Sequence, residues 1–187
     1  DLMSGEYIIN PLEPKLWDDA SGPEDPDAPQ TFRIRSRLSQ HISFLKDFFR
    51  AYKEFSEREM DVIEIMLQEL YQKWNITDET RLEDLDVEDY PILFDFYTFL
   101  EEEYRQFDER KRQLYTAEML QNILLGLHSM CVGSESKFFN GHTNITDEVF
   151  VTFGVKGLLQ ANRSLKDALL FNVLSFMSNK LLSEGNT

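Results

Sequence analysis

The fold is decided most clearly by residues 56–74, which read SEREMDVIEIMLQELYQKW. Apolar residues recur in this stretch every three or four positions, which is the spacing of one face of an α-helix. They are Met60, Ile63, Leu67, Leu70, Tyr71 and Trp74. Ser56 and Glu59 occupy the positions of a capping box, in which each side chain accepts a hydrogen bond from the other residue's backbone N–H. The stretch therefore predicts an amphipathic helix that begins directly after Ser56.

The same period on either side of this stretch predicts three further helices. One lies upstream, one follows Pro91, and one is expected from about Asp108 to Met130. Their expected inward-facing residues are, in chain order, Leu38, Ile42, Leu45, Phe48 or Phe49, Tyr52 and Phe55; then Leu93, Phe96 or Tyr97, Leu100, Tyr104 and Phe107; then Leu114, Met119, Ile123, Leu124 and Leu127. Leu82 and Leu85 predict a short helical turn between the second and third helices. Four amphipathic helices with short links predict a bundle-like, all-helical subdomain over residues 38–130.

Both ends of the chain have a different pattern. Glu6–Ile9 is a short β-prone run that Asn10-Pro11 ends, and Val149–Gly154 is an apolar run of β-branched and aromatic residues, so each predicts a strand. Ser164 is expected to cap a helix from about Leu165 to Leu182. The apolar residues of this helix lie on nearly every side, as they do in a helix that covers a sheet.

These patterns predict a mainly α fold class, with a multi-helix bundle-like subdomain plus two short strands and a buried helix of an incomplete α/β core. Two strands without neighbours form a poor sheet, so we expect the remaining strands to lie outside this chain. Three regions follow from this. Residues 1–37 hold a core strand and an acidic, proline-rich loop, residues 38–130 the helical subdomain, and residues 131–187 a return loop, a core strand and a core helix.

The net charge of −15 and the pI of about 4.5 restrict the partners of the chain. A field of this sign repels phosphate backbones, so we expect no tight binding to nucleic acid. Arg33, Arg35 and Arg37 are the one local basic patch that opposes this expectation, because alternate residues of an extended segment share a face. Cys131 is the only cysteine, so no intrachain disulfide can form and a reducing, cytoplasmic compartment is expected. No apolar run approaches the roughly 18 residues that span a bilayer.

Two groups of residues resemble metal ligands at first sight. His128, Cys131 and His142 supply three zinc ligands, but a structural zinc site needs four, with pairs at tight spacing. The favoured interpretation is a buried thiol and two ordinary imidazoles. The acidic residues of the proline-rich loop lack the glycine-centred spacing of an EF-hand, which favours a solvated loop. They are Asp18, Asp19, Glu24, Asp25 and Asp27.

Motifs of nucleotide binding and hydrolysis are missing from the sequence. Gly154–Gly157 has neither the spacing nor the hydroxyl residue of a phosphate-binding loop. Gly133–Ser136 lacks the second glycine and the preceding strand of a nucleophile elbow. Glu101–Glu103 is interpreted as a solvated helix face. The sequence therefore predicts no catalytic, cofactor-binding or metal-binding residue.

Three segments, in this order, carry a family resemblance: YIINPL at residues 7–12, the helical block at 38–130, and FFNGHTNI at 138–145. They resemble the conjugative-transfer, VirB-type motor ATPases of type IV secretion systems. YIINPL is similar to the end of a core strand in that family, and the helical block to the all-helical insertion of its C-terminal RecA-like domain. FFNGHTNI is similar to the segment that follows the insertion.

This resemblance implies a RecA-like α/β ATPase, hexameric or dimeric, at the cytoplasmic face of a secretion channel. The nucleotide-binding loop would lie upstream of Asp1, and the acidic, metal-binding strand downstream of Thr187. ATP and magnesium are thus expected for the parent protein, and no cofactor for this chain, which would be inactive alone. Other subunits of the same motor and components of the channel would be the partners.

A second hypothesis from a different class stays open on the sequence alone. A free-standing acidic helical protein, such as an adaptor or an inhibitor that mimics nucleic acid, also fits the charge and the helices. Rows of surface carboxylates at phosphate spacing would favour the mimic, whereas two lone strands near the ends favour the fragment. The fragment is the preferred interpretation.

Overall fold

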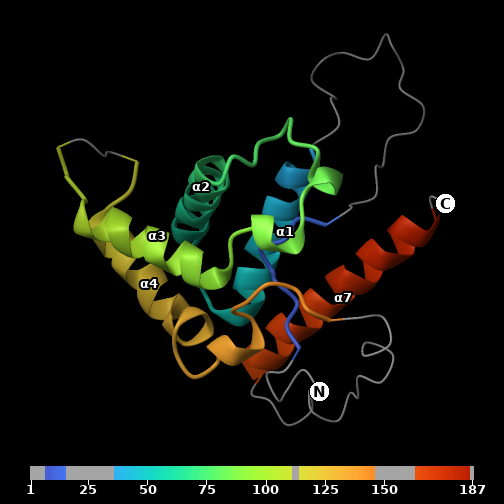
Figure 1. The fold of residues 1–187 in the computed structure, drawn as a ribbon. Helices are drawn as coiled ribbons and strands as arrows, with labels where there is room; N and C mark the ends of the chain where they lie inside the picture. Colours follow the sequence, from blue (N-terminus) through green and yellow to red (C-terminus); the bar gives the residue numbers. More distant parts are fainter. Residues whose placement is uncertain (1–6, 16–35, 111–113, 146–162, 186–187) are drawn as a thin grey trace.

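The computed structural model describes residues 7–15, 36–110, 114–145 and 163–185, and over 180–185 only the helical backbone (Figure 1). These residues form a mainly helical fold. Its α-helices are α1 (Arg37–Tyr52), α2 (Glu57–Lys73), α3 (Leu93–Arg105), α4 (Ala117–Cys131) and α7 (Arg163–Gly185). Three short 3-10 helices are η3 (Leu82–Asp84), η4 (Val87–Asp89) and η5 (Ser136–Phe138). None of the helices in these ranges is long and apolar enough to cross a membrane.

The capping box at the start of α2 is confirmed. The Glu59 backbone N–H donates to Ser56 Oγ at 3.1 Å, and the Ser56 backbone N–H donates to Glu59 Oε1 at 2.9 Å. Ser36 caps α1 in the same way, because its Oγ accepts from the backbone N–H of Ser39 at 3.0 Å. Both helices therefore begin where a hydroxyl satisfies an N–H that has no partner within the helix.

Replacing Ser56 by Ala is expected to lower the free energy of unfolding by about 1 kcal/mol, because the first turn of α2 then loses its cap. Urea unfolding followed by circular dichroism measures this loss. Ser178→Ala, at an exposed position of α7, is the control and should change stability by less than about 0.5 kcal/mol. Equal losses in the two variants would contradict the assigned role of Ser56.

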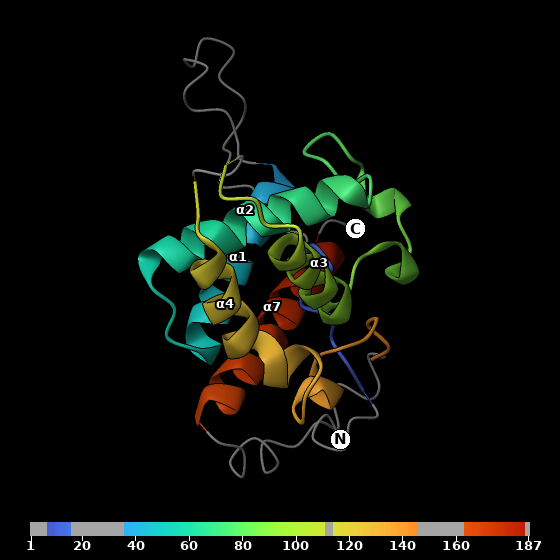
Figure 2. The same ribbon diagram turned by 90° about the vertical axis from the view of Figure 1, so that its left-hand side faces the viewer.

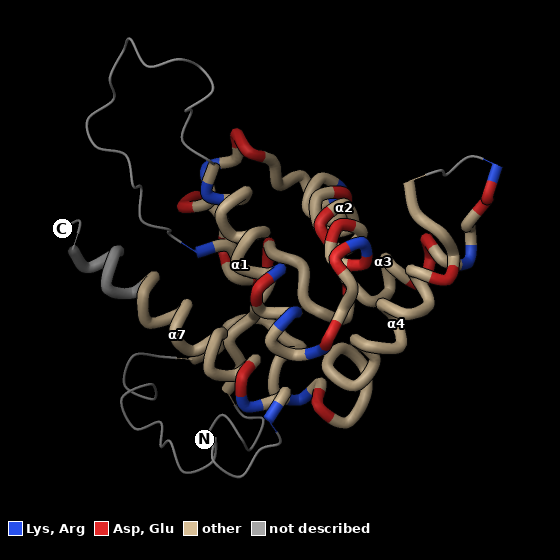
Figure 3. Tube along the Cα trace, turned by 180° about the vertical axis from the view of Figure 1, so that it is seen from behind, with Lys and Arg blue, Asp and Glu red and all other residues tan. Residues whose placement is uncertain are grey.

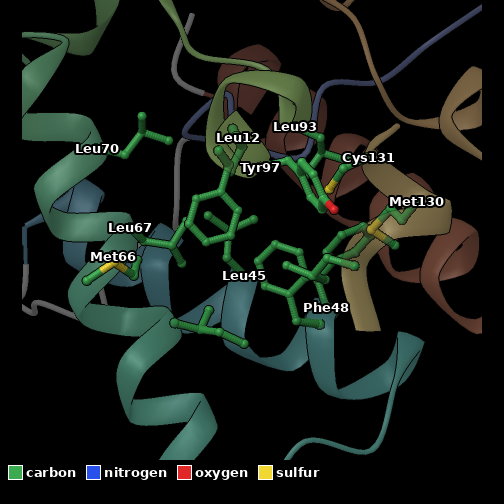
Figure 4. Packing of buried hydrophobic residues seen from close by; sticks show 14 of the residues in the cluster. Leu12, Leu45, Phe48, Met66, Leu67, Leu70, Leu93, Tyr97, Met130 and Cys131 are labelled. Carbon is green, nitrogen blue, oxygen red and sulfur yellow. The ribbon is translucent and has the colours of Figure 1, made fainter. Parts of the chain in front are cut away.

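One hydrophobic core joins the helices, and Leu45 and Phe48 of α1 lie among its packed side chains (Figure 4). Leu45, Phe48 and Phe49 of α1 are all fully buried. The ring of Phe48 meets Phe139 edge-on at 5.6 Å between centroids, and Phe49 lies 5.8 Å from the ring of Phe96 on α3. Burying each such side chain contributes about 1.5–3 kcal/mol. The helix α1 thus holds together elements that are distant in sequence.

The packing of the helices follows from this core. The helices α3 and α4 lie side by side, and α2 crosses the pair (Figure 2). The helix α7 packs on α1, on the side away from α3 and α4 (Figure 1). The inward faces predicted for the first three helices are confirmed at Leu45, Leu67 and Phe96, which are all buried. Tyr104, also predicted to face inward, is 38% exposed near the end of α3. The mainly α fold class is confirmed for the described residues.

The predicted start of the fourth helix near Asp108 is wrong. The helix α4 begins at Ala117, where Thr116 Oγ1 accepts from the backbone N–H of Met119 at 3.2 Å. Before it, α3 ends at Arg105, and Asp108–Arg110 forms a turn. Leu114, predicted to face inward, is 83% exposed. The charged run favours a helix by propensity alone, whereas the Thr116 cap and the packing of α4 on α3 set the actual boundary.

The C-terminal helix differs from its prediction in two respects. It begins at Arg163, so Ser164 lies within α7 and is not its cap. Its apolar residues divide into two faces: Leu165, Ala168, Leu169 and Val173 are buried, whereas Leu170, Phe171, Leu174 and Met177 are 40–52% exposed. The described part of the chain covers only the first face.

The two predicted strands are not supported. Val149–Gly154 lies outside the described residues, and Tyr7–Ile9 belongs to no strand. The backbone N–H of Ile8 donates to Asn144 Oδ1 at 2.7 Å, and the Asn144 N–H donates to the Ile8 carbonyl at 3.1 Å. A side-chain amide thus satisfies a group that a strand would pair with backbone. The division of the chain at residues 37 and 130 stays a prediction.

Candidate functional site

The most unusual feature of the core is a segment without regular structure. Residues 7–15, here called the junction segment, pass between α1, α2 and α7 (Figure 1). Ile9, Asn10 and Leu12 are fully buried, and Lys15 is 4% exposed. Buried backbone groups outside helices and sheets need other hydrogen-bond partners. Side chains from distant parts of the chain provide them here.

Asn10 makes three of these hydrogen bonds. Its Nδ2 donates to the carbonyl of Pro91 at 2.9 Å, and its Oδ1 accepts from the backbone N–H of Leu12 at 3.0 Å. Its own backbone N–H donates to Thr143 Oγ1 at 2.9 Å. Asn10 therefore joins the junction segment both to Pro91, just before α3, and to residues 140–145, which follow η5.

His41 of α1 and Tyr71 of α2 hold the next two carbonyls. His41 Nε2 lies 2.7 Å from the Pro11 carbonyl, so this nitrogen carries the proton and donates. Burial lowers the pKa of His41 to about 3, and the nearby charge of Lys15 acts in the same direction. The Tyr71 hydroxyl donates to the Leu12 carbonyl at 2.5 Å, and burial raises its pKa well above the ordinary value. Both side chains are therefore neutral donors at physiological pH.

The helix α7 holds the segment from the other side. Asn172 Nδ2 donates to the Ile9 carbonyl at 2.7 Å. The ammonium of Lys15 lies 3.7 Å from Glu13 Oε2 and 5.8 Å from the ring centroid of Phe176. Burial lowers the pKa of Lys15, although the Glu13 carboxylate opposes this. Burying an amine is costly, and the Glu13 carboxylate and the Phe176 ring offset part of that cost. Because Phe176 is on α7, the position of the junction segment depends on the position of that helix.

This arrangement can position elements but has no evident chemistry of its own. His41, Tyr71 and Asn172 are neutral donors to backbone carbonyls, and no nucleophile in the described segment lies beside a base. The site therefore has a structural role: the helices α1, α2 and α7, together with residues 140–145, hold the junction segment in place. Sequence reasoning missed His41, Tyr71 and Asn172 as a group. The one available signal was a set of polar residues within otherwise apolar helix faces.

His128, Cys131 and His142, which were considered as zinc ligands, are not brought together. In the described part of the chain no group of three or more His, Cys, Asp or Glu is arranged to hold a metal ion. His128 is exposed and meets the ring of Tyr97 edge-on at 5.9 Å. Cys131 is fully buried, and burial raises the pKa of its thiol. Asp18, Asp19, Glu24, Asp25 and Asp27 lie outside the described residues.

The other candidate residues have ordinary surroundings where the structure describes them. Glu102 is exposed and pairs with Arg105 at 3.4 Å, as expected for a solvated helix face. Arg37 pairs with Glu83 at 3.5 Å. Arg33 and Arg35, like Gly154–Gly157, lie outside the described residues. The predicted basic patch therefore stays untested as a group.

The chain was compared with family models, curated proteins and solved structures, and only the solved structures gave matches. No family model and no curated protein sequence matches the chain. Eight chains of solved structures match it. One of them is VirB4 of Thermoanaerobacter pseudethanolicus, with a TM-score of 0.75 and 24% sequence identity over 96% of this chain. This chain spans 42% of the length of that VirB4 chain. The resemblance predicted from the sequence is confirmed at the level of the fold.

Proposed function

We propose that this chain is a non-catalytic part of a cytoplasmic motor ATPase that powers conjugative DNA transfer or type IV secretion. The observation that carries the proposal is the fold shared with VirB4 across 96% of the chain. YIINPL and FFNGHTNI in the sequence resemble segments of the same class of protein. The other subunits of the motor and the components of the channel are its proposed partners.

The course of the chain supports an inserted helical subdomain. The backbones of Ile8 and Asn144 are hydrogen-bonded, although α1, α2, α3 and α4 all lie between them in sequence. An insertion leaves and re-enters its host at neighbouring points. In the proposal, residues 7–15 and 140–145 are those points, and the junction segment fixes the helices to the host.

The exposed apolar face of α7 supports the presence of a further domain that packs against this helix. Leu170, Phe171, Leu174 and Met177 form an apolar row along one side of the helix. Contiguous exposed apolar surface of this kind marks an interface. We assign this face to the α/β core of the parent protein, and the RecA-like core itself is part of the proposal.

The proposal is tested by the reading frame that contains this chain. Upstream of Asp1 we expect a Gly-x-x-x-x-Gly-Lys-Ser/Thr loop after a strand, and soon after Thr187 an apolar strand that ends in paired acids. These motifs would bind ATP and magnesium, and the residues of this chain are assigned no part in that binding. A start codon just before Asp1 and a stop codon just after Thr187 would favour the acidic adaptor instead.

The chain on its own is expected to bind no ATP, because the phosphate-binding amides, the lysine and the magnesium ligand of such motors are missing from its sequence. Isothermal titration with magnesium-ATP measures this directly. We expect no saturable heat, with the complete parent protein as the positive control. Micromolar binding to the chain alone would show that it contains a nucleotide site.

A further inference from the structure

A groove of about 550 Å³ opens at the C-terminal end of α2. Trp74, Ile76 and Leu85 give it an apolar floor, and Glu88 and Asp89 line it on one side. Trp74 and Leu85 are only partly buried, so both present apolar surface to the groove. Tryptophan is among the side chains that contribute most to binding at protein interfaces. The groove thus places such a side chain directly beside two carboxylates.

Hydrogen bonds of the two turns around the groove fix its shape. Asn75 has a φ of 60°, a left-handed conformation that asparagine adopts more readily than most residues. The chain reverses there, and the backbone N–H of Ile76 donates back to the Tyr71 carbonyl at 2.9 Å. On the other side, the backbone N–H of Asp86 donates to Asp89 Oδ2 at 2.8 Å and caps η4. A surface that is fixed in this way loses little conformational freedom when a partner binds.

The chain around the groove is strongly acidic. Residues 78–89, which connect α2 with α3, contain seven acids and one base, Arg81. Arg81 is already paired, because it lies 3.5 Å from Glu83 and 3.7 Å from Asp84. Figure 3 shows the acidic residues of this connection in red. A field of this sign attracts cationic groups and repels anionic ones.

The two carboxylates of the lining are not neutralised within the described part of the chain. Lys73 is the only base among the lining residues, and its ammonium lies over the ring of Phe99, 5.8 Å from the centroid. No ion pair between described residues joins a base to Glu88 or Asp89. Charge complementarity therefore favours a cationic occupant. Arginine suits the groove best, because its guanidinium both pairs with a carboxylate and stacks on an indole ring.

We propose that this groove binds a segment of a partner protein in which arginine stands next to a large apolar residue. The guanidinium lies over the indole of Trp74 and pairs with Glu88, and the apolar side chain packs on Leu85. Contacts of this small size are weak and reversible, with a Kd on the order of 10⁻⁵ to 10⁻⁴ M. The inference goes beyond the proposed function, since a motor fragment and a free-standing adaptor would both have this groove.

Fluorescence anisotropy of labelled synthetic peptides at about 0.1 M salt tests the proposal. The first peptide has the sequence Arg-Leu-Arg within a background of glycine and serine. In the second peptide lysine replaces both arginines, and in the third serine replaces the leucine. We expect binding of the lysine peptide to be about threefold weaker, because an ammonium neither stacks nor forms a bidentate pair. Binding of the serine peptide should be at least tenfold weaker, because it has no apolar side chain to bury.

Variants of the chain locate the binding site. Glu88 is exposed, so Glu88→Lys should leave the fold intact and weaken binding of the arginine peptide at least tenfold, since attraction becomes repulsion. Glu109→Lys makes the same charge change at an exposed position in the turn after α3 and should change the affinity by less than about twofold. Trp74→Leu keeps an apolar floor without the ring, and should bind the arginine and lysine peptides about equally.

Three results would overturn the inference. The first is binding of the arginine peptide no tighter than about 10⁻³ M. The second is equal affinity for the leucine and serine peptides, which would mean that the net charge of −15 attracts any cation. The third is an equal loss in Glu88→Lys and Glu109→Lys. None of these bears on the reading-frame motifs, so failure here is separate from failure of the proposed function.

Discussion

The variant Asn10→Leu is expected to lose about 4 kcal/mol of unfolding free energy. The Asn10 side chain is fully buried, donating to the Pro91 carbonyl and accepting from the Leu12 N–H. Leucine has a similar volume, so the loss comes from two buried polar groups without partners rather than from a cavity. Each such group costs about 1–3 kcal/mol. Urea unfolding at neutral pH measures the difference.

Two further variants show whether this loss comes from the junction. Asn122→Leu makes the same change at an exposed position of α4 and should alter stability by less than about 0.5 kcal/mol. Thr143→Val removes only the bond from the Asn10 backbone N–H and should cost about 1 kcal/mol. A loss below about 1 kcal/mol in Asn10→Leu would mean that water or another group replaces the amide, and that Asn10 does not hold the junction.

Local patterns predicted the helices of this protein well, because their causes are local. Ser56 and Glu59 are three residues apart, and their reciprocal hydrogen bonds form within one turn. The apolar period of α2 continues through Leu67 to Tyr71, so the face that it predicts is the face that is buried. Where a cap and a stripe coincide, sequence alone sets both the start of a helix and its orientation.

The junction could not be predicted in this way, because its causes are distant. Asn172 and Ile9 are 163 positions apart, and no local pattern relates an asparagine on α7 to a carbonyl near the N-terminus. The apolar residues around Leu170 led to the prediction of a helix buried on nearly every side, whereas Leu170 is 44% exposed. The sequence shows which faces of a helix are apolar but not which partner covers them. The resemblance of YIINPL to a core strand end implied the hydrogen bonds of a strand for this segment. In the structure the backbone N–H groups of Ile8 and Asn10 donate instead to the side chains of Asn144 and Thr143.

Acid is expected to weaken the fold through His41. The pKa of the buried imidazole is about 3 in the folded chain, against an ordinary value of 6.5. Between these two values the unfolded chain binds a proton that the folded chain does not, so stability is fully present above pH 6.5 and falls as the pH falls toward 3. The slope is about 1.4 kcal/mol per pH unit, which makes the loss between pH 6.5 and pH 5 about 2 kcal/mol.

The variant His41→Gln separates this contribution from that of the many carboxylates, which titrate in both proteins. The Nε2 of glutamine can donate to the Pro11 carbonyl, as His41 Nε2 does at 2.7 Å, but it takes up no proton. Urea unfolding at several pH values should therefore show a shallower acid decline in His41→Gln, with about 2 kcal/mol less lost by pH 5. His128→Gln changes an exposed imidazole and should keep the steeper decline. Parallel curves for the unchanged chain and His41→Gln would mean that His41 takes up its proton without unfolding, and that the hydrogen bond from α1 to the junction segment is not maintained in the folded chain.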